Sequence, residues 1–224
     1  MNDIKLSERL ALNEIDINPS SFKPLSLLKR VHYRAALNWL TKEYKMSQDA
    51  SNLDKVHFLL ELFHHLCEVE DWENASKVLL GRFNLFNGEE LGLQLGIWGY
   101  PHLQVKLYRK LGKKANSRVN AFCLFGIANG YRLLDDYLLA QHFYKKASNL
   151  FVQLEEKERG AWILHEMGII EADQGRDEAA RTYYKEALAL FSKIQVYKGI
   201  ALALNDIARV EANQGNYAAL PTSW

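Results

Sequence analysis

Small side chains that return every 40 residues constrain the fold of this chain more than any other feature. Three segments align without gaps: residues 124–147, 164–187 and 204–220. In this alignment Ala128, Gly168 and Ala208 share one column, and both intervals, 168 − 128 and 208 − 168, equal 40 residues. A repeat of this length is typical of an array in which each supersecondary unit stacks on the next.

Further small and aromatic residues agree at the same period. They are Asp135 with Gly175 and Gly215, Ala140 with Ala180, Tyr144 with Tyr184, and Ala147 with Ala187. Ala180 and Ala187 are seven residues apart, so they share one face of a helix, with Tyr184 between them. Small residues allow helix axes to approach to the short end of the usual range of about 8–10 Å. We therefore predict that these columns mark close helix contacts and that the tyrosines fill the space the alanines leave.

The order large, small, Gly, then Ala-x3-Tyr-x2-Ala resembles the tetratricopeptide repeat, a helix–turn–helix unit. In the middle repeat the family's positions correspond to Leu164, Gly168, Ala180, Tyr184 and Ala187. The period is 40 residues, whereas the family's is about 34, and Ser192 stands near the place of the family's helix-ending Pro. The resemblance implies an all-α, right-handed solenoid of helical hairpins. Repeats of this longer period resemble those of G-protein-regulator adaptors and of sensor arrays in bacterial signalling ATPases.

The resemblance covers residues 118–217, and local patterns assign the other ranges. Residues 1–24 are predicted to be a flexible leader, residues 25–117 a helical region with degenerate repeats, and residues 218–224 a C-terminal tail. Because Pro favours the first turn of a helix, we expect two short helices that meet near Gly99–Pro101.

The last repeat is predicted to be incomplete. Its first helix covers about residues 196–213, and Pro221 falls where the second helix would begin, which prevents that helix. The first helix would then expose a face that a partner helix normally covers. Either the chain belongs to a longer array, or another molecule covers this face, with self-association as one possibility. At the other end, residues 25–46 are predicted to form one amphipathic capping helix.

Composition excludes several classes of protein. The formal net charge of +1 gives no global attraction to nucleic acid or to an anionic membrane. Cys67 and Cys123 are too few for a disulfide framework, so buried thiols in a reducing compartment are expected. The sequence has neither the apolar stretch of a secretion signal nor one long enough to cross a bilayer. We therefore expect a cytoplasmic protein without membrane contact.

The search for chemistry predicts no catalytic centre, no cofactor and no metal. Gly112–Lys113 is followed by Lys114 and lacks the upstream Gly of a phosphate-binding loop. No serine lies in a strained elbow motif. One helical segment gathers potential metal ligands, namely His57, Glu61, His64, His65, Cys67 and Glu68. Neither His-Glu-x2-His nor Cys-x2-Cys spacing supports a site there.

The resemblance also implies where a partner would bind. Ligand peptides of the family contact the first helix of each repeat, on both sides of the small-residue column. Carried over by column, these positions are Phe125, Asn129, Arg132, His165, Ile169, Asn205 and Arg209. Phe122, Trp162 and Leu202 extend the set, although the aromatic residues could instead pack between repeats. The expected function is that of a non-catalytic scaffold that binds another protein, or a peptide segment of it, in a concave groove.

Two alternatives stay open. The chain could be a truncated sensor array of a larger signalling ATPase. It could also be a helical repeat that binds nucleic acid through residues 106–118, which carry six cations. Nucleic acid is disfavoured, because cations suit a helix C-terminus and the acidic residues 68–73 offset them.

Overall fold

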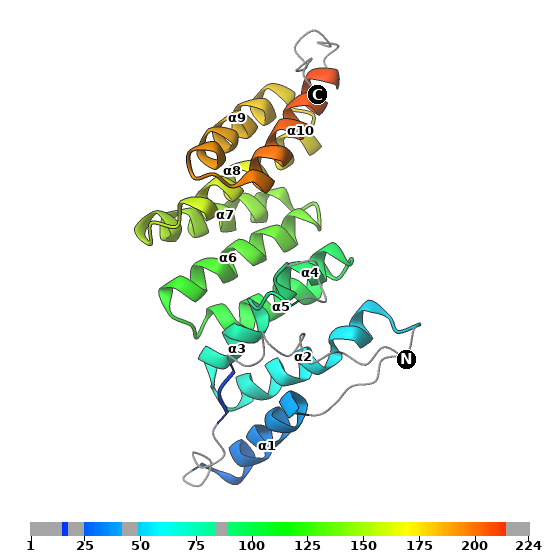
Figure 1. The fold of residues 1–224 in the computed structure, drawn as a ribbon, viewed down its shortest axis with the longest axis vertical. Helices are drawn as coiled ribbons and strands as arrows, with labels where there is room; N and C mark the ends of the chain where they lie inside the picture. Colours follow the sequence, from blue (N-terminus) through cyan, green and yellow to red (C-terminus); the bar gives the residue numbers. More distant parts are fainter. Residues whose placement is uncertain (1–14, 18–24, 42–48, 84–88, 214–224) are drawn as a thin grey trace. The chain divides into compact units, whose positions relative to one another are not determined.

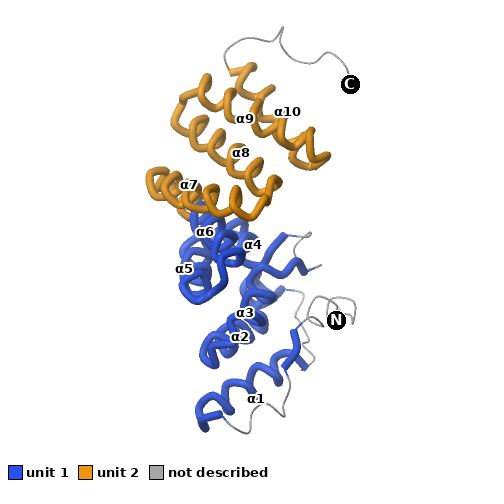
Figure 2. Tube along the Cα trace, turned by 90° about the vertical axis from the view of Figure 1, so that its left-hand side faces the viewer, with its two compact units in different colours: residues 1–130 blue, residues 131–224 orange. Residues whose placement is uncertain are grey.

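The computed structural model of the chain is built from helices (Figure 1). It describes residues 15–17, 25–41, 49–83 and 89–213. Over this part of the chain there are ten α-helices and no strand, so the all-α prediction is confirmed. The chain divides into two compact units, residues 1–130 and 131–224 (Figure 2), each of which is described by itself. The division falls near the end of α6 rather than at residue 118, where the clear repeats begin in the sequence.

Unit 1 contains five helices and most of a sixth. They are α1 Leu27–Thr41, α2 Asn52–Glu68, α3 Trp72–Leu79, α4 Leu91–Ile97, α5 Pro101–Gly112 and α6 Ser117–Arg132. α1 packs on α2, α2 on α3, and α3 on both α4 and α5. A capping box starts α2, because the Asp54 amide donates to Ser51 Oγ and the Ser51 amide donates to the Asp54 carboxylate. Gly99, with φ of 86°, and Pro101 separate α4 from α5, as predicted.

The described part of the predicted leader packs against unit 1. Ile15 and Ile17 are buried, whereas Asp16 between them is exposed. The Asn74 side chain on α3 donates a hydrogen bond of 3.0 Å to the Asp16 carbonyl. The prediction of a flexible leader is therefore wrong at residues 15–17. The alternation of apolar and polar residues in this short extended stretch explains the difference, because it turns both isoleucines to the same side.

Unit 2 contains four helices of equal length. They are α7 Tyr137–Gln153, α8 Lys157–Asp173, α9 Asp177–Lys193 and α10 Tyr197–Asn213, each of 17 residues. Each begins 20 residues after the one before it (157 − 137, 177 − 157, 197 − 177). α8 packs against α7, α9 and α10, and α9 also packs against α10. Residues 42–46 of the predicted capping helix, Gly215, Pro221 and the tail 218–224 lie outside the described residues.

The turns between these helices share one geometry. Asp135, Glu155, Gly175 and Gln195 have φ values of 58°, 56°, 71° and 58°, in the left-handed region. After α9 the Val196 amide donates to the Phe191 carbonyl (2.9 Å) and the Gln195 amide to the Ser192 carbonyl (3.3 Å). This pair of bonds is the Schellman motif, and the same pair follows α7 and α8. Only one of these four turns has the Gly that the motif prefers.

The Gln195→Gly variant should be more stable than the wild-type chain by about 0.5–1 kcal/mol. Left-handed strain of about 1–2 kcal/mol is relieved, against about 0.5–1 kcal/mol for the greater backbone entropy of Gly. Urea unfolding followed by circular dichroism measures the difference. The matched control is Lys185→Gly, at an exposed position within α9, which should lose about 0.7–1 kcal/mol. A loss of stability in Gln195→Gly as well would contradict the turn geometry.

Candidate protein-binding face of the repeat

The predicted packing columns lie in the interior. Tyr144, Tyr184 and the alanines paired around them are fully buried: Ala140, Ala147, Ala180 and Ala187. Gly168 on α8 lies under the Tyr184 ring, and a Cβ atom there would come within 2.6 Å of ring carbons. The small column thus makes room for the aromatic one. Ala128 is fully buried as well, whereas Ala208 on α10 is only partly buried, because the described residues place no second helix against it.

Two apolar clusters join α9 to its neighbours. Tyr184 packs with Ala180 and with Val210 of α10. Phe191 packs with Ala187 and with Ala161 of α8, and it also lies against Gly199, where a Cβ atom would be 2.5 Å from the ring. Phe151 and Phe191 are both buried and 40 residues apart (191 − 151). They form an aromatic column that the sequence analysis did not include.

Acidic side chains lie close to the buried tyrosines. Tyr144 Oη donates to Glu166 Oε2 (3.4 Å), and Arg132 Nε lies 2.7 Å from the same oxygen. Asp206 takes the place of Glu166 one repeat later (206 − 166 = 40). There His165 Nε2 is 2.9 Å from Asp206 Oδ2. Burial and then the Asp206 charge raise the pKa of Tyr184, so this phenol stays protonated.

A second polar column links the second helix of one repeat to the first helix of the next. Gln141 Nε2 on α7 donates to Glu171 Oε1 on α8 (3.4 Å). Arg181 Nη1 on α9 donates to Glu211 Oε1 on α10 (3.1 Å). Both members of the second pair lie 40 residues after those of the first (181 − 141, 211 − 171). The acidic residues at 171 and 211 were a signal available in the alignment, but the analysis followed only small and aromatic residues.

The same spacing reaches into unit 1. The Gln104 side chain on α5 donates to the Gly126 carbonyl on α6 (2.7 Å) and is completely buried. These two residues lie 40 positions before Tyr144 and Glu166 (144 − 104, 166 − 126). The α5 helix therefore occupies the second-helix position of an earlier repeat, which the sequence alone did not place.

Several of the predicted groove residues are buried instead of open. Phe125, Asn129 and His165 lie in the interior, where Asn129 Nδ2 donates to the Phe125 carbonyl (3.0 Å). Arg132 is paired with Glu166, and Ile169 is half-buried beside Tyr184. For Phe125, Asn129, His165 and Arg132 the prediction of partner contact is therefore corrected to a packing role. The sequence could not show that neighbouring helices reach these positions.

Residues 120–193, which cover most of α6 and all of α7 to α9, match the family model described as tetratricopeptide repeat. The chain carries tetratricopeptide repeats. A search of curated proteins finds no match to the chain. Repeats of this family generally mediate protein–protein interaction through the surface that stacked helices present.

The open part of the predicted groove in the tetratricopeptide unit lies on α10. Leu202 and Asn205 are exposed, and Arg209 is half exposed with Nη2 3.4 Å from Asp206 Oδ1. We call these three residues the α10 strip. On α8, Trp162 is half-buried, with its ring 4.8 Å from that of Phe191 and its Nε1 donating to Glu158. The alternative that this aromatic residue packs between helices describes its position.

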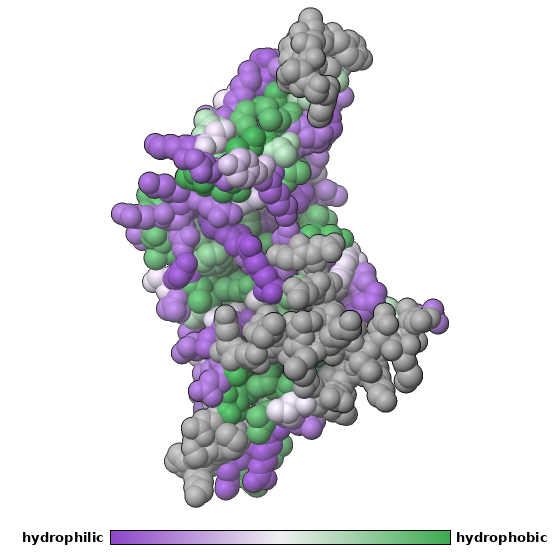
Figure 3. Space-filling model, in the orientation of Figure 1, coloured by the Kyte–Doolittle hydropathy of each residue, from purple (hydrophilic) through white to green (hydrophobic). Residues whose placement is uncertain are grey.

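A second face of α10 carries apolar side chains into solvent. Tyr197 is 77% exposed and Leu204 is 45% exposed, and Ala201 between them is exposed too. Apolar side chains reach the surface over α9 and α10 (Figure 3). This is the side of the third repeat's first helix on which a following helix would pack.

The remaining candidate chemistry of the tetratricopeptide chain is subdued. Burial raises the pKa of Cys67 and of Cys123 to about 12, so both are inert thiols at neutral pH. In the basic segment, Lys110 is paired with Glu68 at 2.9 Å. Among the described helices, none combines the length and the apolar character that a bilayer crossing requires.

Proposed function

We propose that the tetratricopeptide repeats of this chain form a non-catalytic scaffold that binds an extended segment of a partner protein along the α10 strip. The observation that carries the proposal is the open Leu202, Asn205 and Arg209 set on α10, in the columns where the family binds its ligands. Trp162 and Ile169 of the adjacent α8 are half-buried and extend the apolar part of this face. The stacked helices beneath hold the strip in a fixed geometry.

The chemistry of the strip favours an extended segment that carries a carboxylate. The Asn205 amide can both donate to and accept from a peptide backbone, and Leu202 offers apolar contact. The Arg209 guanidinium is half exposed, and it shares Asp206 with His165. It therefore keeps donors for an acidic side chain or a C-terminal carboxylate of the partner. Arg132, which Glu166 holds, has no part in this binding.

The experiment selects peptides from a displayed random library on the full chain and measures the affinity of synthesised winners by isothermal titration calorimetry. We expect winners to carry a carboxylate, and Arg209→Glu to weaken them at least tenfold, which corresponds to about 1.4 kcal/mol or more. Asn205→Ala should weaken the same peptides, whereas Lys185→Glu, a matched charge reversal at an exposed position of α9, should not. Equal affinity for all four proteins would overturn the proposal, provided that circular dichroism shows equal helicity.

A further inference from the structure

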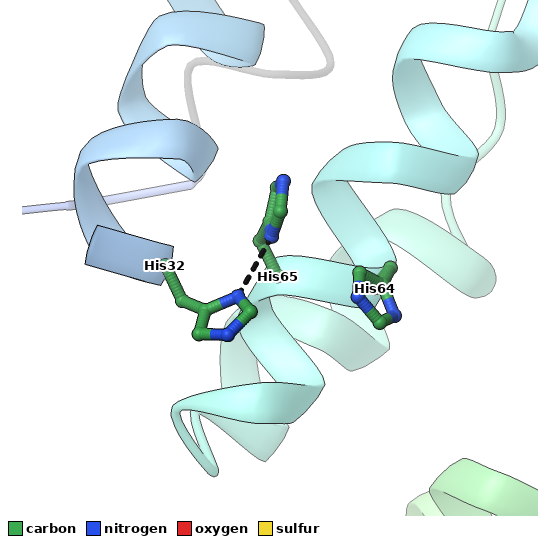
Figure 4. Close-up of side chains that lie close together, drawn as sticks. All are labelled: His32, His64 and His65. Atoms are coloured by element: carbon green, nitrogen blue, oxygen red, sulfur yellow. Dashed lines mark hydrogen bonds between the residues drawn. The ribbon is translucent and has the colours of Figure 1, made fainter. Parts of the chain in front are cut away.

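We propose that His32, His64 and His65 form a binding site for a divalent metal ion of the zinc type, at the contact between α1 and α2 in unit 1. This site is separate from the α10 strip and does not depend on the function proposed for it. The potential ligand nitrogens of the three rings all lie within 4.8 Å of one another. Figure 4 shows His32 approaching from α1 toward His65 of α2, with His64 on the adjacent position of α2.

The two closest nitrogens face each other directly. His32 Nδ1 lies 2.9 Å from His65 Nδ1, and the ring centroids are 5.2 Å apart. A tetrahedral zinc ion with Zn–N bonds of about 2.1 Å separates neighbouring ligand nitrogens by about 3.4 Å. The pair therefore needs to open by only a few tenths of an ångström to admit the ion. His64, whose ring centroid is 5.2 Å from that of His65 and 6.1 Å from that of His32, supplies a third ligand by a side-chain rotation.

The protonation state of the cluster suits a metal. A histidine must be neutral to ligate an ion. Burial and the neighbouring histidines lower the pKa of His65, which leaves the imidazole neutral at pH 7. Without an ion, the two facing Nδ1 atoms can be satisfied only when one ring donates its proton to the other. A bound cation would instead be contacted by a lone pair of each ring.

Carboxylates stand behind the rings in the places of outer-shell partners. Glu61 Oε2 lies 4.0 Å from His65 Nε2, the nitrogen that faces away from His32. Glu68 Oε1 lies 3.9 Å from His64 Nδ1, although Lys110 also contacts that oxygen. A ligating His commonly gives its second ring N–H to a carboxylate, which fixes the ring and raises its basicity. The cluster therefore has three first ligands on two helices, at least one carboxylate placed to orient them, and a fourth position open to water.

The sequence alone could not show this cluster. The segment around α2 gathers His57, His64 and His65, but their spacing matches no zinc motif on a single helix. The missing ligand is His32, which lies on α1 and is brought to His65 only by packing of the two helices. An ion held from both helices would clamp α1 onto α2.

The test is a calorimetric titration of the untagged full chain with Zn²⁺ at pH 7.4. We expect one ion per chain, and at least about a 100-fold loss of affinity in His32→Gln and in His64→Gln, because removing a ligand costs no less than removing an outer-shell partner. Glu61→Gln should lose about tenfold. His102→Gln removes an exposed histidine of α5 outside the cluster and should leave the affinity unchanged.

Two further measurements separate a lost ligand from a lost fold. The His64 side chain is half exposed, so His64→Gln should keep the circular dichroism and thermal stability of the metal-free chain. Zn²⁺ should also slow amide exchange in α1 of the wild-type chain, but not in α1 of His32→Gln. The proposal is overturned if the wild-type chain takes up no Zn²⁺ at micromolar concentration, or if His32→Gln and His64→Gln bind it as tightly as the wild type.

Discussion

The Tyr184→Ala variant should lose about 3–5 kcal/mol of the free energy of unfolding of unit 2, the usual cost of emptying a large aromatic site in a core. The ring is fully buried, lies on Gly168 of α8, and packs with Val210 of α10. Its removal leaves a cavity that α9 shares with both neighbours. Because Gly168 already brings the α8 backbone close, the surrounding chain has little side-chain volume with which to fill the space.

Urea unfolding gives the overall loss, and amide exchange shows whether it falls on α8, α9 and α10. Tyr184→Phe is the first control, since it keeps the ring and should lose no more than about 1 kcal/mol. Tyr183→Ala removes the half-buried neighbour on the same helix and should cost clearly less. Equal losses in the two alanine variants would mean that Tyr184 does not hold the hairpins together.

The packing of the repeat could be predicted from the sequence because it depends on volume. Where a glycine or alanine returns at a fixed spacing beside a tyrosine, the helices have few other ways to fit. Gly168 under Tyr184 is the clearest case, and the burial of Ala180 and Ala187 is another. These features repeat within short segments, so an alignment of the chain with itself contains them.

The polar contacts could not be predicted in the same way. A carboxylate such as Asp206 looks like a solvated surface group until the helix that carries His165 is placed beside it, 41 residues away in the chain. The same holds for Arg132, which the family pattern offers as a ligand contact and which the structure pairs with Glu166. Burial of one helix face by another decides between the two roles, and that depends on tertiary packing, not on helix periodicity.

Replacing Arg132 by Leu should lower the stability of unit 2 by about 2–4 kcal/mol. The two side chains of the Arg132–Glu166 pair are only 19% and 14% exposed, and desolvation and the Glu166 charge act on the guanidinium together. Removing one partner leaves the other charge poorly solvated, which costs far more than the net contribution of an exposed pair. The Tyr144 hydroxyl still donates to Glu166, but one neutral donor replaces little of a lost cation.

Arg176→Leu is the matched control on an exposed pair. Arg176 is 48% exposed and contacts Glu171, so its loss should cost less than about 1 kcal/mol. The double variant Arg132→Leu, Glu166→Gln should recover most of the loss, because the uncompensated charge is gone while the Tyr144 hydroxyl keeps an acceptor. If Arg132→Leu instead costs as little as Arg176→Leu and the double variant recovers nothing, the pair behaves as a surface pair. Arg132 would then return to the set of residues open to a partner, and the binding face would extend from α10 back to the end of α6.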